Sequence, residues 1–311
     1  MPRLEPSLLR NVRTIVSHAD CPDGIASALI LRAALPGACV VFVEHNTPEQ
    51  AALPATEGMI FCDVVPPRDR VSEFVRAGAI VLDHHKGARD VVEAFGERGV
   101  FADEKAEPGM SGAPLAHREV FCALRDDDPE VKRFARLAGI RDCWLTDDPD
   151  WEEAAAQSSA LIFFGYQRLA EQIPPDRPPH LTEAQMSVGR AQRATRLASA
   201  TATADKKLHH LRPGVAVYND RDRLLSDVAG LAFERDASLR VICGFHYKVT
   251  SDGAMLLVCS LRSKPDDVDV ARIAKRQGGG GHTCAAGFGV PVTLTSPSPL
   301  AVVDEAIGKL P

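Results

Sequence analysis

The 311-residue sequence has few aromatic side chains and no excess of basic residues. Aromatic residues make up 5% of the chain and the formal net charge is −6. A long channel for single-stranded nucleic acid needs stacking aromatics and positive charge, so this composition argues against one. It also gives no global field that would attract duplex DNA. Any nucleic-acid contact must come from local patches, and a small phosphorylated ligand is easier to accommodate.

Long apolar runs are also missing. No run approaches the roughly 20 residues that span a bilayer, and the N-terminal "MPRLEPSLLRNVR" has no apolar signal-peptide core. We therefore expect no membrane partner and a cytoplasmic location.

The eight cysteines stand singly, without a C-x-x-C pair. This spacing predicts neither a zinc ribbon nor a disulfide framework. Most cysteines fit the role of small buried residues. Cys21, Cys62 and Cys143 each stand beside an aspartate, which leaves a soft-metal site as a minority hypothesis.

The N-terminal half alternates short apolar runs with amphipathic segments. This pattern predicts an α/β fold with a doubly wound, mainly parallel sheet. We expect strands at 12–17, 38–43, 59–62 and 79–82, helices at 24–34 and 68–78, and mainly helical structure over 111–170.

A proline-rich stretch, "QIPPDRPPH" at 172–180, suggests a domain boundary. The sequence predicts a first, metal-binding domain over 1–180 and a connecting helix over 181–208. A smaller mixed α/β, substrate-binding domain is expected over 209–311.

Potential metal ligands follow three of the predicted strands. They are His18, Asp20 and Asp23; Asp63; and Asp83, His84 and His85. A single aspartate after a strand is usually a turn former or a helix N-cap, and Asp20 or Asp23 could cap the helix near Gly24. Three such ends in one sheet are different, because the carboxyl ends of parallel strands meet at one edge. Converging carboxylates and imidazoles favour a divalent cation, Mn²⁺ or Mg²⁺ rather than structural zinc.

Asp142, in "AGIRDCWLTDD", could add a fourth ligand where a helix ends. The nearby Asp147, Asp148 and Asp150 fit a solvated loop better.

A glycine run marks the C-terminal half, in "AKRQGGGGHTCAAGF". Gly279, Gly280 and Gly281 could present backbone N–H groups to a phosphate, with His282 at the end of the run. A flexible loop is the alternative. Arg262 and Ser263 could add donors to the same ligand, although an exposed arginine without a role is equally consistent with the spacing.

These motifs together resemble the DHH phosphoesterase superfamily, joined to its DHH-associated nucleotide-binding domain, over nearly the whole chain. "SHADCPDG", "FCDVV", "VLDHHKGA" and "IRDCW" resemble its four metal motifs, and "SLRSK" with "GGGGHTCAAGF" resembles the C-terminal signature. This group includes nanoRNases, 3′-phosphoadenosine 5′-phosphate phosphatases and RecJ-like exonucleases.

The resemblance implies a hydrolase with two Mn²⁺ ions, or Mg²⁺ or Co²⁺, in a cleft between the domains. His18, Asp20, Asp23, Asp63, His84 and Asp142 would be the metal ligands, with Asp63 bridging the two ions. His85 would face the phosphate and Asp83 would orient a histidine. Arg262, Ser263, Gly279, Gly280, Gly281 and His282 would hold the substrate. A metal-activated water would attack phosphorus, so Cys21 is not the nucleophile.

The first motif departs from the commoner family form, because Asp20 and Asp23 are three residues apart rather than two. Which of them binds metal stays open.

Three functions follow from this resemblance. The first is hydrolysis of short oligonucleotides, dinucleotides or small nucleotides to nucleoside monophosphates. The second is a RecJ-like 5′-to-3′ exonuclease, which the acidic balance disfavours. The third is a non-catalytic nucleotide-binding regulator. The sequence leaves a homodimer open.

Overall fold

The computed structural model describes residues 3–45, 47–103, 105–175, 177–250, 253–265, 267–293 and 295–308. The chain divides into two compact units between Arg193 and Ala194. This division falls inside the predicted connecting segment. Each unit is considered by itself below.

A parallel sheet forms the centre of the first unit. Among the described residues it has five strands in the order β2-β1-β3-β4-β5. The strands are β1 (Thr14–His18), β2 (Cys39–Val43), β3 (Met59–Cys62), β4 (Ile80–Asp83) and β5 (Gly99–Phe101). Four of them match the predicted strands to within two residues at each end, whereas β5, a short edge strand, was not predicted.

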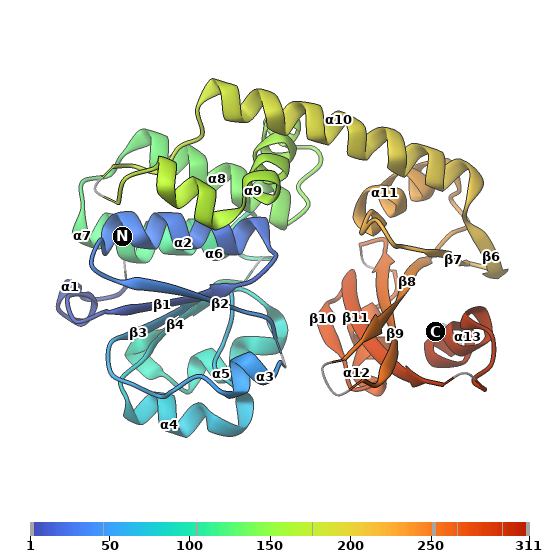
Figure 1. The fold of residues 1–311 in the computed structure, drawn as a ribbon, viewed down its shortest axis with the longest axis horizontal. Helices are drawn as coiled ribbons and strands as arrows, with labels where there is room; N and C mark the ends of the chain where they lie inside the picture. The colour runs from blue at the N-terminus through green and yellow to red at the C-terminus, as the bar shows by residue number, and fades with distance from the viewer. Residues whose placement is uncertain are drawn as a thin grey trace. The chain divides into compact units, whose positions relative to one another are not determined.

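Helices cover both faces of this sheet (Figure 1). The alternation of side chains along each strand explains why. Ile15 and Ile60 pack with α2 (Pro22–Ala34) on one face, whereas Val16 and Phe61 pack with the helices that follow β3 and β4 on the other. The elements on this second face and at the sheet margins are α3 (Pro48–Ala51), η1 (Arg68–Arg70), α4 (Val71–Arg76), η2 (Lys86–Ala88), α5 (Arg89–Glu93) and η3 (Gly96–Arg98). The predicted doubly wound sheet is confirmed.

The segment after β5 is helical, as predicted. Its elements are α6 (Gly112–Ala116), η4 (His117–Phe121), α7 (Cys122–Leu124), α8 (Pro129–Asp142) and α9 (Trp151–Gln172). Unlike its neighbours, η4 is a π-helix. The N-terminal α1 (Pro6–Leu9) precedes the sheet, and α10 (Glu183–Lys206) carries the chain into the second unit.

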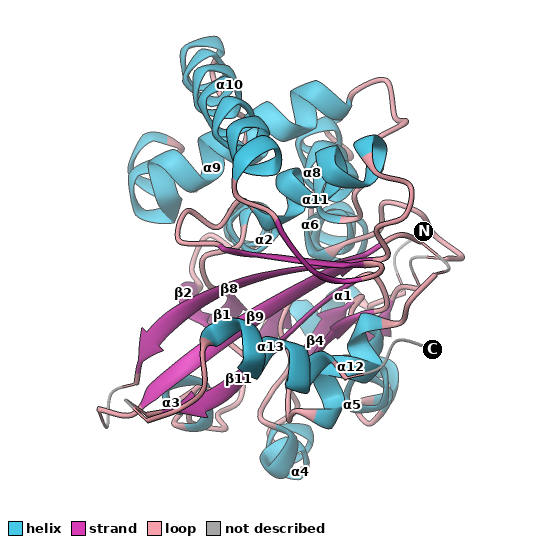
Figure 2. Cartoon of the chain, turned by 90° about the vertical axis from the view of Figure 1, so that its right-hand side faces the viewer, coloured by secondary structure: helices cyan, strands magenta, loops and turns pink. Residues whose placement is uncertain are grey.

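The second unit contains a mixed sheet that has six strands within the described residues, in the order β10-β11-β9-β8-β7-β6. They are β6 (His209–Arg212), β7 (Val215–Asn219), β8 (Val241–Val249), β9 (Met255–Ser263), β10 (Gly280–His282) and β11 (Ala285–Val292). Helices α12 (Val270–Arg276) and α13 (Pro299–Ile307) pack on one face, seen in Figure 2, and α11 (Leu225–Arg235) packs on the other. The prediction of a second, mixed α/β domain is confirmed.

None of the helices in the described ranges is both long and apolar enough to cross a bilayer.

Candidate metal centre

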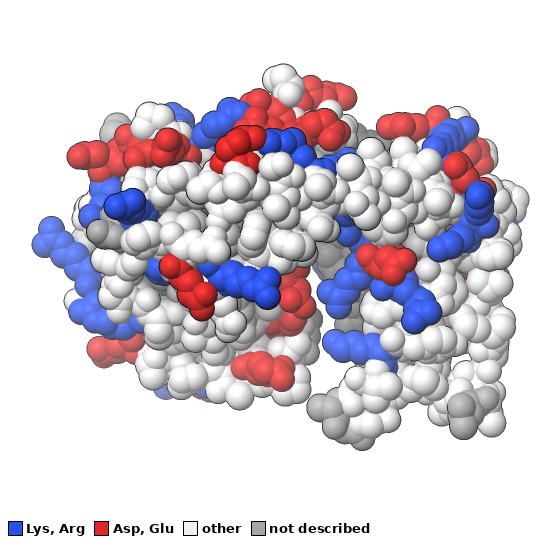
Figure 3. All heavy atoms as spheres, turned by 45° about the horizontal axis from the view of Figure 1, so that its top comes forward, with Lys and Arg blue, Asp and Glu red and all other residues white. Residues whose placement is uncertain are grey.

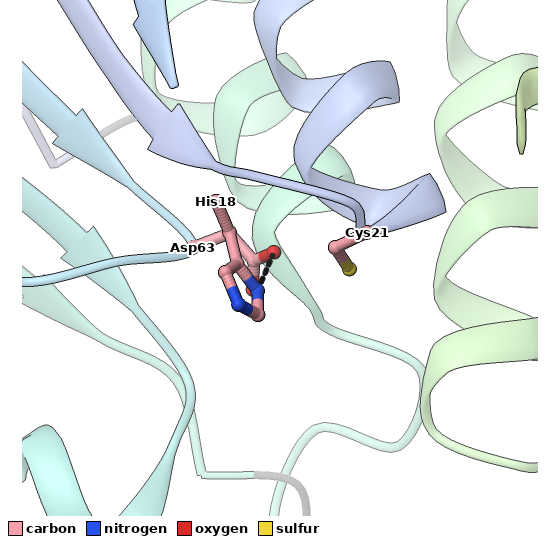
Figure 4. Close-up of side chains that lie close together, drawn as sticks. All are labelled: His18, Cys21 and Asp63. Carbon is pink, nitrogen blue, oxygen red and sulfur yellow. Dashed lines mark ion pairs between the residues drawn. The ribbon is translucent and has the colours of Figure 1, made fainter. Parts of the chain in front are cut away.

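The carboxyl ends of β1, β3 and β4 bring a carboxylate and two imidazoles together. Asp63, directly after β3, lies between His18 at the end of β1 and His84 after β4. Its Oδ2 is 3.5 Å from His18 Nδ1, and its Oδ1 is 3.2 Å from His84 Nε2. Figure 4 shows His18 and Asp63 pointing toward one another, with Cys21 beside them. Asp63 is therefore shared by two donor groups.

The second donor group extends to the end of α8. His84 Nε2 lies 3.4 Å from Asp142 Oδ2, and Cys143 lies in the same group of potential ligands. His84 is fully buried, whereas Asp142 is exposed. One side of this group is thus open to solvent.

Asp83 holds the backbone and ring of His85. Its Oδ1 accepts a hydrogen bond from the His85 backbone N–H at 2.7 Å and lies 2.9 Å from His85 Nδ1. His85 Nδ1 is also 3.9 Å from Asp63 Oδ1. Asp83 has the geometry that an orienting residue needs, while the catalytic role of His85 stays a prediction.

Asp23 anchors a neighbouring helix. Its carboxylate accepts hydrogen bonds from Ser111 Oγ at 2.7 Å and from the backbone N–H groups of Gly112 and Ala113 at 2.7 and 3.1 Å. It therefore caps α6 rather than its own helix, α2, and it does so while fully buried beside the centre. Whether it also binds metal stays a prediction.

Asp20 stands apart from the donor groups found in the described residues. It is exposed and has a left-handed backbone, with φ of 51°. Cys21 instead approaches His18 and Asp63, with one potential ligand atom from each residue within 4.8 Å of the others.

The protonation of these groups reflects their crowding. Burial alone would raise the pKa of Asp63, but His18 and His84 hold it well below its usual range. Burial, together with the charges of Asp63 and Asp142, raises the pKa of Asp23 to about 8. Burial would lower the pKa of His18, but its contacts, with Asp63 foremost, raise it above the ordinary value. The raised pKa of Asp23 reflects burial and repulsion by its acidic neighbours, and a bound cation would relieve this repulsion.

Two orphaned atoms mark where a cation fits. His18 Nδ1 and Asp63 Oδ2 are buried and have no hydrogen-bond partner. Ligands around a divalent cation, with bonds of about 2.0–2.2 Å, lie about 3.0–3.6 Å apart. The His18–Asp63, His84–Asp63 and His84–Asp142 distances, 3.2 to 3.5 Å, all fall in that range. The spacing of these donors fits the binding of a divalent cation.

The predicted substrate residues lie in the second unit. Arg262 donates to Ser226 Oγ at 3.0 and 3.2 Å and is only partly exposed, so the alternative of an exposed arginine is wrong. Arg262 and His282 flank Ala285 in one row of the sheet, because each pairs with it directly. Directly paired residues project to the same face. Ser263 is buried and donates its hydroxyl to Val268 O at 2.6 Å.

The glycine run is partly an edge strand rather than a flexible loop. A Cβ at Gly279 would lie 2.1 Å from Gly287 O, and one at Gly281 would lie 2.5 Å from Ala285 O. Gly281 also has φ of 135°. Close packing against β11 therefore requires glycine at these two positions, whereas Gly280 faces open space. Phosphate contact by the run stays a prediction.

No protein-family model matches the sequence, and no curated protein matches it. The structure is nevertheless similar to solved structures. One is described as the DHH domain of a member of a family of ribosomal proteins; it has a TM-score of 0.61 and 11% sequence identity, and the match covers 97% of this chain and 87% of that one. The chain has the DHH-domain fold. A second is RecJ from Thermus thermophilus in complex with Mn²⁺, with a TM-score of 0.54 and 17% identity. That match covers 97% of this chain and 52% of the RecJ chain, so this chain spans about half of RecJ's length.

Sequence reasoning missed two side chains at the carboxyl edge of this sheet. Glu44 Oε2 lies 3.4 Å from His18 Nε2, and the His45 ring centre lies 4.8 Å from that of His18. Both follow β2, so the strand-end rule applied to 38–43 would have found them. Cys143, which the sequence left as a possible soft-metal ligand, lies in one group with His84 and Asp142.

Strained backbone conformations are concentrated in the loops that carry or adjoin the candidate metal ligands. Four non-glycine residues of the described chain have positive φ, and three of them are Asp20, Asp63 and Trp144, at 51°, 63° and 56°. Asp tolerates this region better than most residues, but for Trp it is an outlier. The loops hold these conformations because the surrounding hydrogen bonds and packing fix them.

Proposed function

We propose that the protein is a divalent-metal-dependent phosphoesterase that hydrolyses short oligonucleotides, dinucleotides or small nucleotides such as 3′-phosphoadenosine 5′-phosphate. The observation that carries this proposal is the sharing of Asp63 between two donor groups at the carboxyl edge of a DHH-fold sheet. Two-cation sites of this kind serve in-line displacement at phosphorus.

Two cations would be held by different residues. His18 would hold the first, His84 and Asp142 would hold the second, and Asp63 would serve both. Asp23 is a further candidate ligand, but its carboxylate is already engaged by Ser111 and by the N-terminus of α6. Asp20 is the second candidate from the first motif, and its side chain is exposed.

Two Mn²⁺ ions are the proposed cofactor, as the RecJ structure carries Mn²⁺. When bound, the cations supply Lewis-acid stabilisation and lower the pKa of a water molecule. The thiols of Cys21 and Cys143 lie among the donors and suit softer cations such as Co²⁺ or Zn²⁺. Metal titration therefore compares Mn²⁺, Mg²⁺, Co²⁺ and Zn²⁺.

His85 is the proposed catalytic residue. Its Nδ1 lies 2.9 Å from Asp83 Oδ1, which fixes the orientation of the ring, and the proposed partner of the ring is the substrate phosphate. Asp83 stabilises the protonated ring, because burial would lower the pKa of His85 but the Asp83 carboxylate raises it. A cationic imidazole would stabilise charge that develops on the phosphate oxygens.

Substrate recognition is assigned to the second unit. Arg262 and His282 share one face of the sheet, and the arginine is already oriented by Ser226. Guanidinium and imidazole donors suit a phosphate or a nucleobase. On the face seen in Figure 3, acidic and basic side chains are interspersed rather than arranged as a basic stripe, which supports a small substrate.

A substrate series tests the proposal. Turnover is measured with Mn²⁺ on 5′-labelled RNA and DNA of increasing length, with cyclic di-AMP, cyclic di-GMP and 3′-phosphoadenosine 5′-phosphate alongside. We expect mononucleotide release, with rates that fall steeply beyond about five nucleotides, because longer strands need an extended groove.

Two outcomes favour the other functions. Processive degradation of long strands would support a RecJ-like exonuclease, a candidate favoured by the structural likeness to RecJ. Nucleotide binding without turnover under any metal would support a non-catalytic regulator.

A further inference from the structure

A further group of potential ligands is separate from the metal centre described above. His117, Cys122 and Asp127 each offer one donor atom, and these atoms lie within 4.8 Å of one another. None of the three belongs to the motifs used for the phosphoesterase site. They come from η4, the start of α7 and the loop before α8.

The π-helix creates the first half of this group. His117 and Cys122 are five residues apart, which on an α-helix would place them about 140° apart around the axis. In η4 the Cys122 backbone N–H donates to His117 O, an i→i+5 bond. This wider turn brings the two side chains onto one face, and Cys122 Sγ lies 3.6 Å from His117 Nε2. π-turns of this kind occur frequently at functional sites.

Asp127 closes the group from the loop. Its Oδ1 is 3.3 Å from His117 Nε2 and 3.8 Å from Cys122 Sγ. Its other oxygen is 3.9 Å from Lys132 Nζ, which partly balances its charge. The His117 side chain is 10% exposed and the Asp127 side chain 58% exposed. The group is therefore buried on the histidine side and open to solvent on the aspartate side.

Two of the three separations match those of tetrahedral zinc ligands. Zinc bonds of about 2.3 Å to sulfur and about 2.0–2.1 Å to nitrogen or oxygen place such ligands about 3.3–3.6 Å apart. The distances from His117 to Asp127 and Cys122 are 3.3 and 3.6 Å, and the distance from Cys122 to Asp127 is slightly longer, at 3.8 Å. A neutral hydrogen-bonded triad would be expected at shorter N···O distances, near 2.9 Å.

We propose that His117, Cys122 and Asp127 form a second metal site that binds a borderline-soft divalent cation such as Zn²⁺. The thiolate excludes Mn²⁺ and Mg²⁺ as preferred occupants. A water molecule completes the tetrahedron on the open side. Binding deprotonates Cys122 and releases one proton to the solvent.

The site joins two parts of the helical segment. It links the π-helix to the loop that begins α8, and α8 ends at Asp142 of the phosphoesterase centre. A bound ion would tie this loop to the π-helix, and its loss should leave the phosphoesterase centre in place, because Asp142 lies at the opposite end of α8.

Zinc stoichiometry tests this site. Full-length protein is dialysed against Zn²⁺ and its metal content is measured by mass spectrometry for wild type, Asp127→Asn and Cys122→Ser. Asp126→Asn and Cys39→Ser are the matched controls, because both residues are exposed and lie outside every ligand group in the described residues. We expect both site variants to bind one Zn²⁺ fewer than wild type, and both controls to bind the same number.

Two further measurements fix the interpretation. In the Co²⁺-substituted protein, the thiolate-to-cobalt charge-transfer absorption should be weaker in Cys122→Ser than in wild type. Anomalous diffraction at the zinc absorption edge should place an ion among the three side chains. Equal Zn²⁺ content in wild type and Asp127→Asn would overturn the proposal. Asp127→Asn should keep its Mn²⁺-dependent turnover, so a failure here is distinct from a failure of the phosphoesterase assignment.

Discussion

Asp63 is the residue on which the proposed metal centre depends. It is buried and lies within 4 Å of nitrogen atoms from His18, His84 and His85. A neutral side chain there would leave the imidazoles without their shared counter-charge. No other carboxylate among the described residues belongs to two of the donor groups.

Asp63→Asn tests this role. Asparagine keeps the shape and tolerates the positive φ, so we expect a folded protein that loses both metal binding and turnover, the latter by on the order of 10³-fold.

His85→Ala should keep metal and lose turnover. Calorimetric metal titration and the nucleotide assay measure the two effects, with the exposed Asp69→Asn as control. If His85→Ala lost metal as Asp63→Asn does, the division of roles between the histidines would be wrong.

At the level of secondary-structure elements, helix α6 packs closely against the candidate metal centre at Gly112. A Cβ at this position would lie 2.6 Å from Asp63 Cβ and 2.8 Å from Asp23 Oδ2. The N-terminus of α6 therefore packs directly against both aspartate side chains. Only glycine allows this approach.

Gly112→Ala should push α6 away from the Asp23 and Asp63 side chains. We expect the overpacking to cost about 1–3 kcal/mol of stability and to weaken metal binding at least about tenfold. Gly37→Ala is the control, because nothing lies within 4 Å of its Cβ. Chemical denaturation and metal titration measure both variants. Unchanged metal affinity in Gly112→Ala would show that the carboxylates are not positioned by α6.

The strands were predictable and some loops were not. The apolar run at 59–62 predicted β3. Because the carboxyl ends of parallel strands meet at one edge, the sequence also predicted that Asp63 and His84 would lie close together. The loop after His18 was different, because its backbone turns Asp20 outward and Cys21 inward, which the residue types do not encode. The π-turn of η4 was equally invisible, since "APLAHREVFCAL" fits ordinary helical spacing.

Over the whole molecule, the proposed cofactor and substrate residues belong to different units. The donor groups lie in Met1–Arg193, whereas Arg262 and His282 lie in Ala194–Pro311. Metal alone should therefore stabilise only part of the chain.

Hydrogen exchange of the full chain with and without Mn²⁺ checks this expectation. Protection should rise in segments 18–24, 62–65, 83–86 and 140–144, which carry or support the ligands, because the bound ions suppress local opening. The strands β7, β8 and β9 should not change. A uniform rise over both units, or none in the first, would contradict the assignment of the ligands.

The left-handed backbone at Asp63 and Trp144 sets a limit on how stable this protein can be made. Each such residue costs on the order of 1–2 kcal/mol, which glycine would recover. Selection for thermal tolerance alone would therefore favour replacements in these loops. The first property to be lost would be the arrangement of the candidate metal ligands. Stabilising designs should leave these loops unchanged and draw on the solvent-facing positions of α8 and α9 instead.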